Sequence, residues 1–460
     1  MSKSFSATQV FPHLFTMAKQ YYAGGQGALG AQVAAFDALA VSFEGSGEYI
    51  RSRGANEVID FLLHGFQTAT DLRIARKAAT ALAALADVIG DEVTVYHDQI
   101  MPRVVQLMDE PVTSLQRAAC TLLEVLMDEL EESLPAYLPT LIPRLLQLLD
   151  TNETLRSSVL GALTSAATTS GDQFGQYFEP TMQRLQAIIC REPVEGKEDH
   201  KELDTRGLAV ETVNAVAEAV GKQAFAPFLP TMMQFIVASG HAENSTLQSC
   251  SYHFFGAMAK LFQSDYAPYL DHTVKLLLHA AEHADDEDLT VSEQTLNQLI
   301  EQEEDDEEEG SLQLNNVFSD STDVKSAALE CLMDVFEGCG ELFSHAYLKR
   351  VLPILHENIK HEHCDIRCVA IGGLCRVAQI FGKLHHPQAA VSAGRVMPPA
   401  LHPDVQSAIT DLANHLYPLL KKEGEPEVVI TILEGLKDTI DQIGAAVFQQ
   451  RTDFVLMLVL

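Results

Sequence analysis

Carboxylates are the side chains of this sequence most able to do chemistry, and they are concentrated between residues 282 and 309. That stretch holds fourteen Asp and Glu residues and no Lys or Arg. Because so many like charges repel one another on a packed surface, the sequence predicts an acidic, disordered insertion over residues 284–320. Its candidate partner-binding carboxylates are Asp285, Asp286, Glu287, Asp288, Glu301, Glu303, Glu304, Asp305, Asp306, Glu307, Glu308 and Glu309.

A polyanionic segment of this kind can attract Lys- and Arg-rich protein segments through salt-sensitive electrostatic forces. On that hypothesis, removing residues 285–309 weakens the binding of a basic partner and flattens its salt dependence. The alternative is that the segment only solvates a connection between two helices. The formal net charge of −33 also argues against nucleic acid or an anionic membrane as a direct partner, because both would be repelled.

Other chemically capable groups are weaker candidates. Three cysteines of the cluster at 361–375 fall on a predicted helix among apolar residues, and the cluster lacks the tight knuckle that pairs ligands in structural zinc sites. We therefore expect core thiols and no metal at His361, His363, Cys364, Cys368 and Cys375. The sequence has no Gly-x-Ser-x-Gly elbow, phosphate-binding glycine loop or His-Glu-x-x-His pair, so it predicts neither an enzyme nor a cofactor.

Smaller acidic groups have two open interpretations. They either line a concave partner-binding surface or are ordinary solvated side chains. These groups are Asp128 and Glu129 with Glu131 and Glu132, and Glu211 with Glu218.

The elements that must position these groups are helices in a repeating pattern. Between residues 134 and 171, an apolar stripe at helical spacing ends in a polar turn at 150–152, and a second stripe follows. That is the pattern of a helix hairpin. An aromatic residue followed by an apolar one recurs at the start of the first helix, at Tyr137-Leu138, Tyr177-Phe178, Phe228-Leu229, Tyr269-Leu270 and Tyr347-Leu348.

Two further landmarks mark the second helix of each hairpin. Its predicted start carries an N-cap followed by an apolar and a basic or polar residue, at Asp71-Leu72-Arg73, Ser114-Leu115-Gln116, Thr154-Leu155-Arg156, Asp323-Val324-Lys325 and Asp365-Ile366-Arg367. Its predicted end carries a glycine that lets the chain turn back, at Gly90, Gly171, Gly221, Gly340, Gly382 and Gly444.

A period of about forty residues with two antiparallel helices per unit is typical of HEAT or armadillo repeats. The Asp-apolar-basic start favours HEAT, so we expect an all-α HEAT-repeat α-solenoid of about nine hairpins. Residues 1–283 would form about six hairpins and the first helix of the seventh. The acidic insertion (284–320) would follow, and residues 321–460 would complete the seventh, eighth and ninth hairpins and start a tenth. Helices over about 266–283 and 321–339 would flank the insertion.

Cysteine usage and hydropathy indicate the compartment. The eight cysteines are scattered through apolar helical patterns, as free thiols are in a reducing environment. No segment resembles a signal peptide or a membrane-spanning helix. We therefore expect a location in the cytoplasm, the nucleus or both. The apolar final segment, 454–460, indicates a chain that is part of something longer.

Several helix starts resemble those of a known family. The segments 225–230, 266–270 and 343–348 and the helix from Asp323 to Leu332 after the acidic insertion resemble the karyopherin-β (importin-β) nuclear transport receptors, particularly their importin-4 and importin-5 branch. The resemblance implies a superhelix that wraps basic protein cargo, passes nuclear pores by binding FG-repeat nucleoporins, and shuttles between cytoplasm and nucleus.

The resemblance also implies release of cargo by Ran-GTP. Members of that family begin with an importin N-terminal domain that forms the main Ran-GTP site, and no equivalent precedes the first hairpin here, which leaves Ran binding open. The alternative function is a HEAT-repeat scaffold of another kind, such as a phosphatase regulatory subunit or an assembly platform. Retention on FG-repeat peptide would favour the carrier, and capture of a phosphatase would favour the scaffold.

Overall fold

The computed structural model describes residues 7–23, 29–53, 55–68, 71–130, 133–191, 200–240, 242, 244–288, 313–385 and 402–443. Within these ranges every regular element is an α-helix or a short 3-10 helix, and no strand occurs. The prediction of an all-α fold is therefore confirmed.

The α-helices follow one another as antiparallel pairs. The first helices are α1 (Ala7–Ala23), α3 and α4 (Gly47–Arg53 and Asn56–Thr68), α6 (His97–Asp109), α8 (Leu138–Thr151), α10 (Phe178–Ile189), α12 (Leu229–Ser239), α14 (Ala267–Asp288), α18 (Leu348–Asn358) and α20 (Pro403–Leu420). The second helices are α2 (Leu29–Phe43), α5 (Leu72–Ile89), α7 (Thr113–Glu129), α9 (Arg156–Ser170), α11 (His200–Phe225), α13 (Ser245–Phe262), α16 (Gln313–Cys339), α19 (Cys364–His385) and α21 (Pro426–Ile443).

Shorter helices connect several pairs. They are α17 (Glu341–Ala346) and the 3-10 segments Glu44–Ser46, Gly90–Tyr96, Leu134–Ala136, Glu153–Leu155, Gly171–Tyr177 and Gln263–Tyr266.

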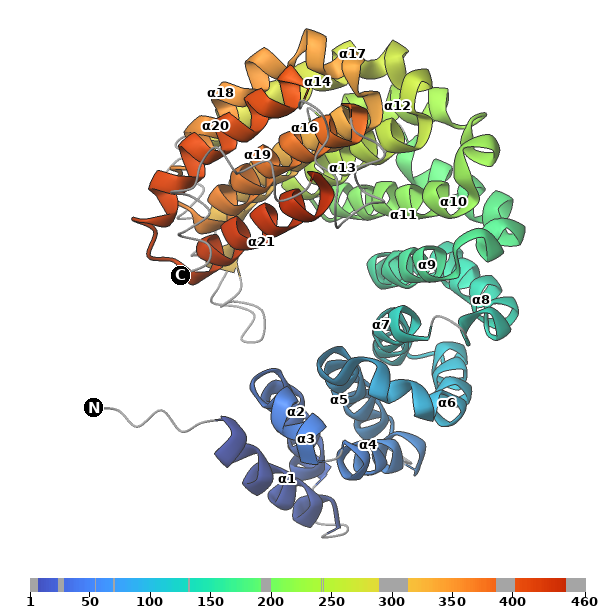
Figure 1. The fold of residues 1–460 in the computed structure, drawn as a ribbon. Coiled ribbons are helices and arrows are strands. Elements are labelled where there is room, and N and C mark those ends of the chain that lie inside the picture. The colour runs from blue at the N-terminus through green and yellow to red at the C-terminus, as the bar shows by residue number, and fades with distance from the viewer. Residues whose placement is uncertain are drawn as a thin grey trace. The chain divides into compact units, whose positions relative to one another are not determined.

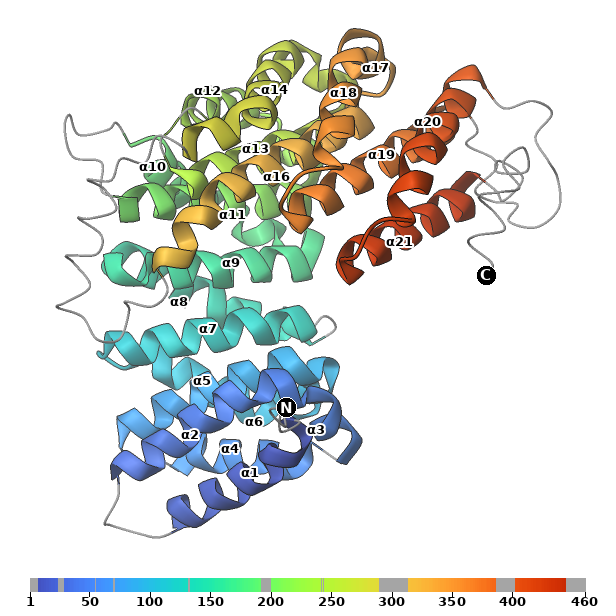
Figure 2. The same cartoon turned by 90° about the vertical axis from the view of Figure 1, so that its left-hand side faces the viewer.

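The chain divides into two compact units, residues 1–193 with 211–227 and residues 194–210 with 228–460, so that α11 contributes to both. In the first unit the second helices α2, α5, α7 and α9 pack side by side as one layer (Figure 1). In the second unit α13, α16, α19 and α21 form the corresponding layer (Figure 2). Each unit therefore presents a continuous surface of second helices.

The core of each pair lies between its two helices. In the fourth pair, Leu141 and Leu145 of α8 and Val159 and Leu163 of α9 are completely buried. The two residues named on each helix are four positions apart, which places them on the same helix face. Burying an aliphatic side chain of this size stabilises the fold by about 1.5–3 kcal/mol, so the apolar pattern seen at 134–171 accounts for this hairpin.

Four of the predicted closing glycines make the turns that the sequence requires. Gly90, Gly171, Gly221 and Gly340 have φ between 52° and 79°, which glycine adopts without strain. The prediction is wrong at Gly382, which lies inside α19. A Cβ there would be 2.8 Å from Ile443 Cγ1, so this glycine allows α19 and α21 to pack closely. Gly444 lies outside the described residues.

The predicted N-caps are only partly correct. Asp71 caps α5, because its carboxylate accepts a hydrogen bond from the Arg73 amide at 2.9 Å. Before α9 the cap is Asn152, which accepts from the Thr154 amide at 3.2 Å and serves as well as Asp or Ser. The other three predicted caps lie inside helices that begin at an earlier residue. They are Ser114, Asp323 and Asp365.

The helices beside the acidic insertion are longer than expected. Helix α14 continues to Asp288 and α16 begins at Gln313, whereas the sequence indicated helices over 266–283 and 321–339. The apolar pattern marks only the packed part of each helix, and backbone hydrogen bonds propagate beyond it at little cost. Because α14 and α16 pack against each other and α16 packs along α13, the division between the units falls at α11 and not at the insertion.

Candidate functional site

The acidic insertion lies largely outside the described residues. Asp285, Asp286, Glu287 and Asp288 occupy the last positions of α14. The other candidate carboxylates lie beyond the described ranges, namely Glu301, Glu303, Glu304, Asp305, Asp306, Glu307, Glu308 and Glu309. Their role as a polyanionic arm stays a prediction.

A second group of carboxylates lies on the second-helix surface of the first unit. Glu124 of α7 extends over α9, because a Cβ built on Gly161 would be 2.7 Å from the Glu124 Oε1 atom. Asp128 lies one turn further along α7, and Glu211 of α11 is close enough to act on the same carboxylate. Helices α7 and α11 thus bring together three carboxylates beside α9, which we call the α7–α11 acidic site.

The electrostatics of the α7–α11 acidic site favour a bound cation. Partial burial, together with the charges of Asp128 and Glu211, raises the pKa of the Glu124 carboxyl above its ordinary value. Within the described residues, no Lys, Arg or His pairs with Glu124, Asp128 or Glu211. A Lys or Arg side chain from another protein would relieve this repulsion.

Small side chains on α9 leave room for the acidic site. Gly161 has no side chain, and the Thr164 hydroxyl oxygen lies 3.0 Å from that of Thr212 on α11. Thr164 also donates to the Leu160 carbonyl at 3.0 Å. These short contacts hold α9 and α11 close together, so Glu124 and Glu211 approach from the two sides of α9.

Only part of this site was predicted from the sequence. Asp128 and Glu211 were candidates, each grouped with other acids, and Glu124 was not among them. The signal was available, because Glu124 lies four residues before Asp128 on the same helix face. Glu218 is exposed on α11, and Glu131 and Glu132 lie outside the described residues.

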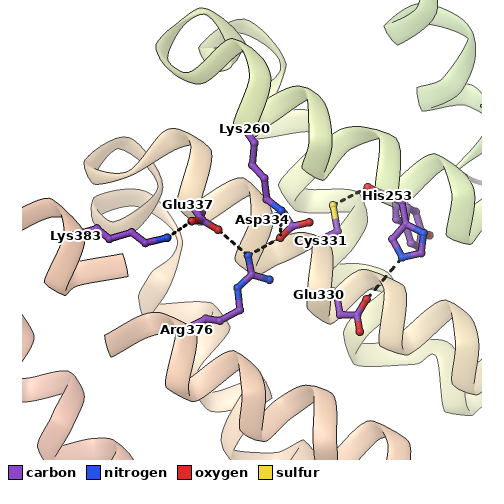
Figure 3. A network of polar contacts seen from close by, with 9 residues as sticks. His253, Lys260, Glu330, Cys331, Asp334, Glu337, Arg376 and Lys383 are labelled. Atoms are coloured by element: carbon purple, nitrogen blue, oxygen red, sulfur yellow. Dashed lines mark hydrogen bonds and ion pairs between the residues drawn. The ribbon is translucent and has the colours of Figure 1, made fainter. Parts of the chain in front are cut away.

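The second-helix surface of the second unit carries acids with cationic partners (Figure 3). On α16, Asp334 pairs with Lys260 of α13 at 2.8 Å and with Arg376 of α19. Glu337 pairs with Arg376 at 3.1 Å and with Lys383, also on α19. Burial opposes ionisation of Glu337, but Lys383 and Arg376 outweigh it and lower the pKa of the Glu337 carboxyl. From α13 to α19, this surface therefore neutralises Asp334 and Glu337 with its own cations.

An apolar pocket of about 260 Å³ lies between α12 and α14, the first helices of consecutive pairs in the second unit. Its lining from α12 includes Met233 and Val237, and its lining from α14 includes Pro268 and Tyr269. A hollow of this size and composition suits one aromatic or aliphatic side chain of a peptide.

The recurring aromatic residue at the first helix joins consecutive pairs. The Tyr137 hydroxyl donates to Asp98 Oδ1 at 3.1 Å and lies 2.7 Å from His97 Nδ1. In the second unit, the Tyr347 hydroxyl donates to Asp271 Oδ1 at 2.9 Å. The sequence pattern located these tyrosines but not their partners, which lie in the preceding pair.

Arginines on the first helices make a second set of contacts between pairs. Arg144 Nε lies 3.2 Å from Asp109 Oδ1, and Arg184 Nη2 lies 2.8 Å from Asp150 Oδ2. The partners are partly exposed, so each ion pair contributes only about 0.2–1 kcal/mol. These contacts set the register between pairs and leave the second-helix surface free for other partners.

The cluster at 361–375 does not form one ligand set. Cys375 is buried in α19, and burial raises the pKa of its thiol to about 12, which disfavours the thiolate that a metal needs. Cys364 instead lies beside Asp365 and Glu427. None of the eight cysteines is in a disulfide.

No helix in the described ranges combines the length and apolar character needed to cross a membrane.

The chain is similar to known helical-repeat proteins. The family model described as "Importin subunit beta-1-like, TPR repeats" matches residues 32–195. The probable importin subunit beta-4 of Schizosaccharomyces pombe (strain 972) is 27% identical over 84% of this chain and 36% of its own length. The chain therefore spans about a third of that relative.

Solved structures agree on the fold. A mutant of Kap121p superposes with a TM-score of 0.62 at 16% identity, over 96% of this chain and 46% of that chain. The karyopherin Kap121p bound to the extreme C-terminus of the protein phosphatase Cdc14p gives a TM-score of 0.54 at 15% identity, over 98% of this chain and 52% of that one. With the helical pairs described above, these comparisons show that the chain is similar in sequence to importin subunits of the beta type and similar in fold to karyopherins.

Proposed function

We propose that the chain is part of a nuclear transport receptor of the importin-β type, a non-catalytic carrier that binds basic protein cargo and shuttles between cytoplasm and nucleus. The observation that carries the proposal is the α7–α11 acidic site, where Glu124, Asp128 and Glu211 converge without a cation from the described residues. The karyopherin Kap121p bound to the C-terminus of a phosphatase supports a peptide segment as the form of the cargo.

The mechanism is the sum of several weak contacts. A Lys or Arg of the cargo lies over Gly161 and pairs with Glu124 and Glu211. Its positive charge offsets the repulsion between these two carboxylates. The acidic insertion adds a long-range attraction that raises the rate of encounter. Each contact is modest, so affinity depends on simultaneous engagement of several sites along the helical pairs.

The pocket between α12 and α14 is proposed as a contact for FG-repeat nucleoporins. Its apolar lining suits the phenylalanine ring of such a repeat, and it lies on first helices of the second unit, whereas the acidic site lies on second helices of the first. Cargo and nucleoporin would therefore bind different helices. Ran-GTP is proposed as the regulator of the whole receptor, on the family resemblance alone.

Fluorescence anisotropy with a Lys- and Arg-rich peptide tests the cargo proposal. The double variant Glu124→Gln with Glu211→Gln should bind about tenfold more weakly at low salt, because two partly exposed ion pairs are lost. The matched control, Asp334→Asn with Glu337→Gln, makes the same change in net charge on the other second-helix surface. Equal losses in both double variants would refute a specific role for the acidic site.

Retention on immobilised Phe-Gly peptide tests the nucleoporin proposal. Val237→Glu places a charge in the pocket and should abolish retention, whereas Ala238→Glu adds the same charge at an exposed neighbour and should not. Unaltered retention of Val237→Glu would exclude this pocket as the contact.

A further inference from the structure

A compact group of metal-ligating side chains lies in the second unit, on α18 and α20. We propose that His356, Asp411 and His415 bind a divalent transition-metal ion of the zinc type. One ligand atom of each residue lies within 4.8 Å of the other two. Two imidazoles and one carboxylate form a ligand set that proteins use for zinc and related ions.

Two helices from consecutive pairs bring these ligands together. His356 lies in the last turn of α18, and Asp411 and His415 are four residues apart on α20, which places them on one helix face. Each ligand is next to a buried leucine, Leu355 beside His356 and Leu412 and Leu416 beside the other two. The packed core therefore fixes the backbone positions of all three ligands.

The distances suit a tetrahedral ion. His356 Nε2 lies 2.8 Å from Asp411 Oδ2, and His415 Nδ1 lies 3.2 Å from Asp411 Oδ1. The two imidazole rings are stacked, with centroids 3.8 Å apart. Metal–ligand bonds of about 2.0–2.1 Å require ligand atoms about 3.4 Å from one another. The observed separations, from 2.8 to at most 4.8 Å, bracket that value, and the two imidazole rings must turn out of their stack so that a nitrogen lone pair of each points to the ion.

The burial of the group is intermediate, as a binding site requires. The side chains of His356, Asp411 and His415 are 27%, 28% and 31% exposed. An ion can therefore enter from solvent, and a water or a ligand from another molecule can complete a fourth position. The surrounding protein limits competition by water for the three coordination positions that the side chains would fill.

Other groups of similar composition are less suitable. In the group of His385, His402 and Asp404, two members are exposed, and His402 Nδ1 accepts a hydrogen bond from the Asp404 amide as the N-cap of α20. At Cys364, the hydrogen bond to Asp365 raises the pKa of the thiol, which disfavours the thiolate. At the site of His356 all three side chains are partly buried, and ion binding there requires His415 Nδ1 to give up its 2.9 Å hydrogen bond with the Asp411 backbone carbonyl.

A bound ion would cross-link the first helices of two consecutive pairs. Because the ligands converge only in the folded chain, ion binding stabilises that arrangement, and the stabilisation grows with the logarithm of the ion concentration above the dissociation constant. The proposed ion would therefore hold α18 against α20 and restrict bending between these pairs.

Isothermal titration of the chelator-treated chain with Zn²⁺ tests the proposal, with Co²⁺ absorption to report the ligand types. The wild type should bind one ion with a tetrahedral Co²⁺ spectrum that lacks a thiolate charge-transfer band. The His356→Ala and Asp411→Asn variants should each bind the ion at least about tenfold more weakly than the wild type. His253→Ala removes a histidine that pairs only with Glu330, and it should bind as the wild type does.

Circular dichroism of each variant without metal separates misfolding from loss of the site, and the milder His356→Gln replaces any variant that unfolds. Wild-type affinity in the two ligand variants would overturn the proposal. A thiolate band in the Co²⁺ spectrum, or loss of binding in His253→Ala, would also overturn it, because either result places the ion elsewhere.

Discussion

Carboxylates at two places on the second helices, the α7–α11 acidic site of the first unit and the α13–α19 surface of the second, have opposite surroundings. In the first unit, burial and neighbouring acids raise the pKa of Glu124. In the second, Lys383 and Arg376 lower the pKa of Glu337 despite burial. One repeat architecture can therefore present an unsatisfied acidic surface at α7–α11 and a self-neutralised one at α13–α19. The difference indicates that the α7–α11 acidic site is better prepared for a basic partner than the α13–α19 surface.

The largest expected effect concerns how closely the second helices pack. A Cβ on Gly338 of α16 would overlap the backbone carbonyl of Ala259 on α13, whereas a Cβ on Gly161 would meet only the flexible end of Glu124. Gly338→Ala should therefore reduce the free energy of unfolding by about 3 kcal/mol. Gly161→Ala should stay within about 1 kcal/mol of wild type. Urea denaturation measures both, and equal losses would contradict the difference in packing.

Removing a satisfied acid should destabilise the second unit. Glu337→Gln should reduce the free energy of unfolding by about 1 kcal/mol at neutral pH, since its partners are partly exposed. Because the pKa of Glu337 is lowered on folding, its stabilisation is present above the unfolded pKa and lost as pH falls through the folded one. Denaturation at neutral and acidic pH should show the variant and the wild type converge in acid.

Removing an unsatisfied acid should do the reverse. Glu124→Gln should increase the free energy of unfolding at neutral pH by about 0.5 kcal/mol, because like charges one helical turn apart destabilise by about that amount. The pKa of Glu124 is raised on folding, so the wild type is favoured below the unfolded pKa and loses that advantage as pH rises through the folded one. A destabilised Glu124→Gln at pH 7 would show that Glu124 has a partner.

The smallest expected effect belongs to the acidic insertion. Deleting residues 289–309 leaves α14 intact to Asp288 and should weaken a basic peptide about twofold near physiological salt, where charges beyond about 8 Å are screened. The loss should grow as salt is lowered. An affinity unchanged across a salt series would contradict a role for the insertion in binding.

Much of the fold could be predicted because its signals are local. The apolar stripes at 134–171, the four turn glycines and the Asp71 cap each depend on a few consecutive residues. The closing-glycine pattern failed at Gly382 because close packing of two helices also favours glycine. One residue type thus serves two purposes that the sequence does not distinguish.

The candidate sites could be predicted less well because they depend on contacts between pairs. Glu124 and Glu211 are far apart in the sequence, and only the packing of α7, α9 and α11 brings them together. The same holds for His356 with Asp411, which join α18 to α20. The high charge density of the insertion predicted a binding site there. The acids that come together in the described structure are instead widely spaced in the sequence.

Photo-cross-linking tests most directly the claim that the two second-helix surfaces differ in their capacity for a basic partner. A Lys- and Arg-rich peptide with a photoreactive group is bound to the wild-type chain, and the cross-linked residues are identified by mass spectrometry. We predict cross-links on α7, α9 and α11 that disappear when Glu124 and Glu211 are replaced by Gln. Cross-links concentrated on α13, α16 and α19 would contradict the account.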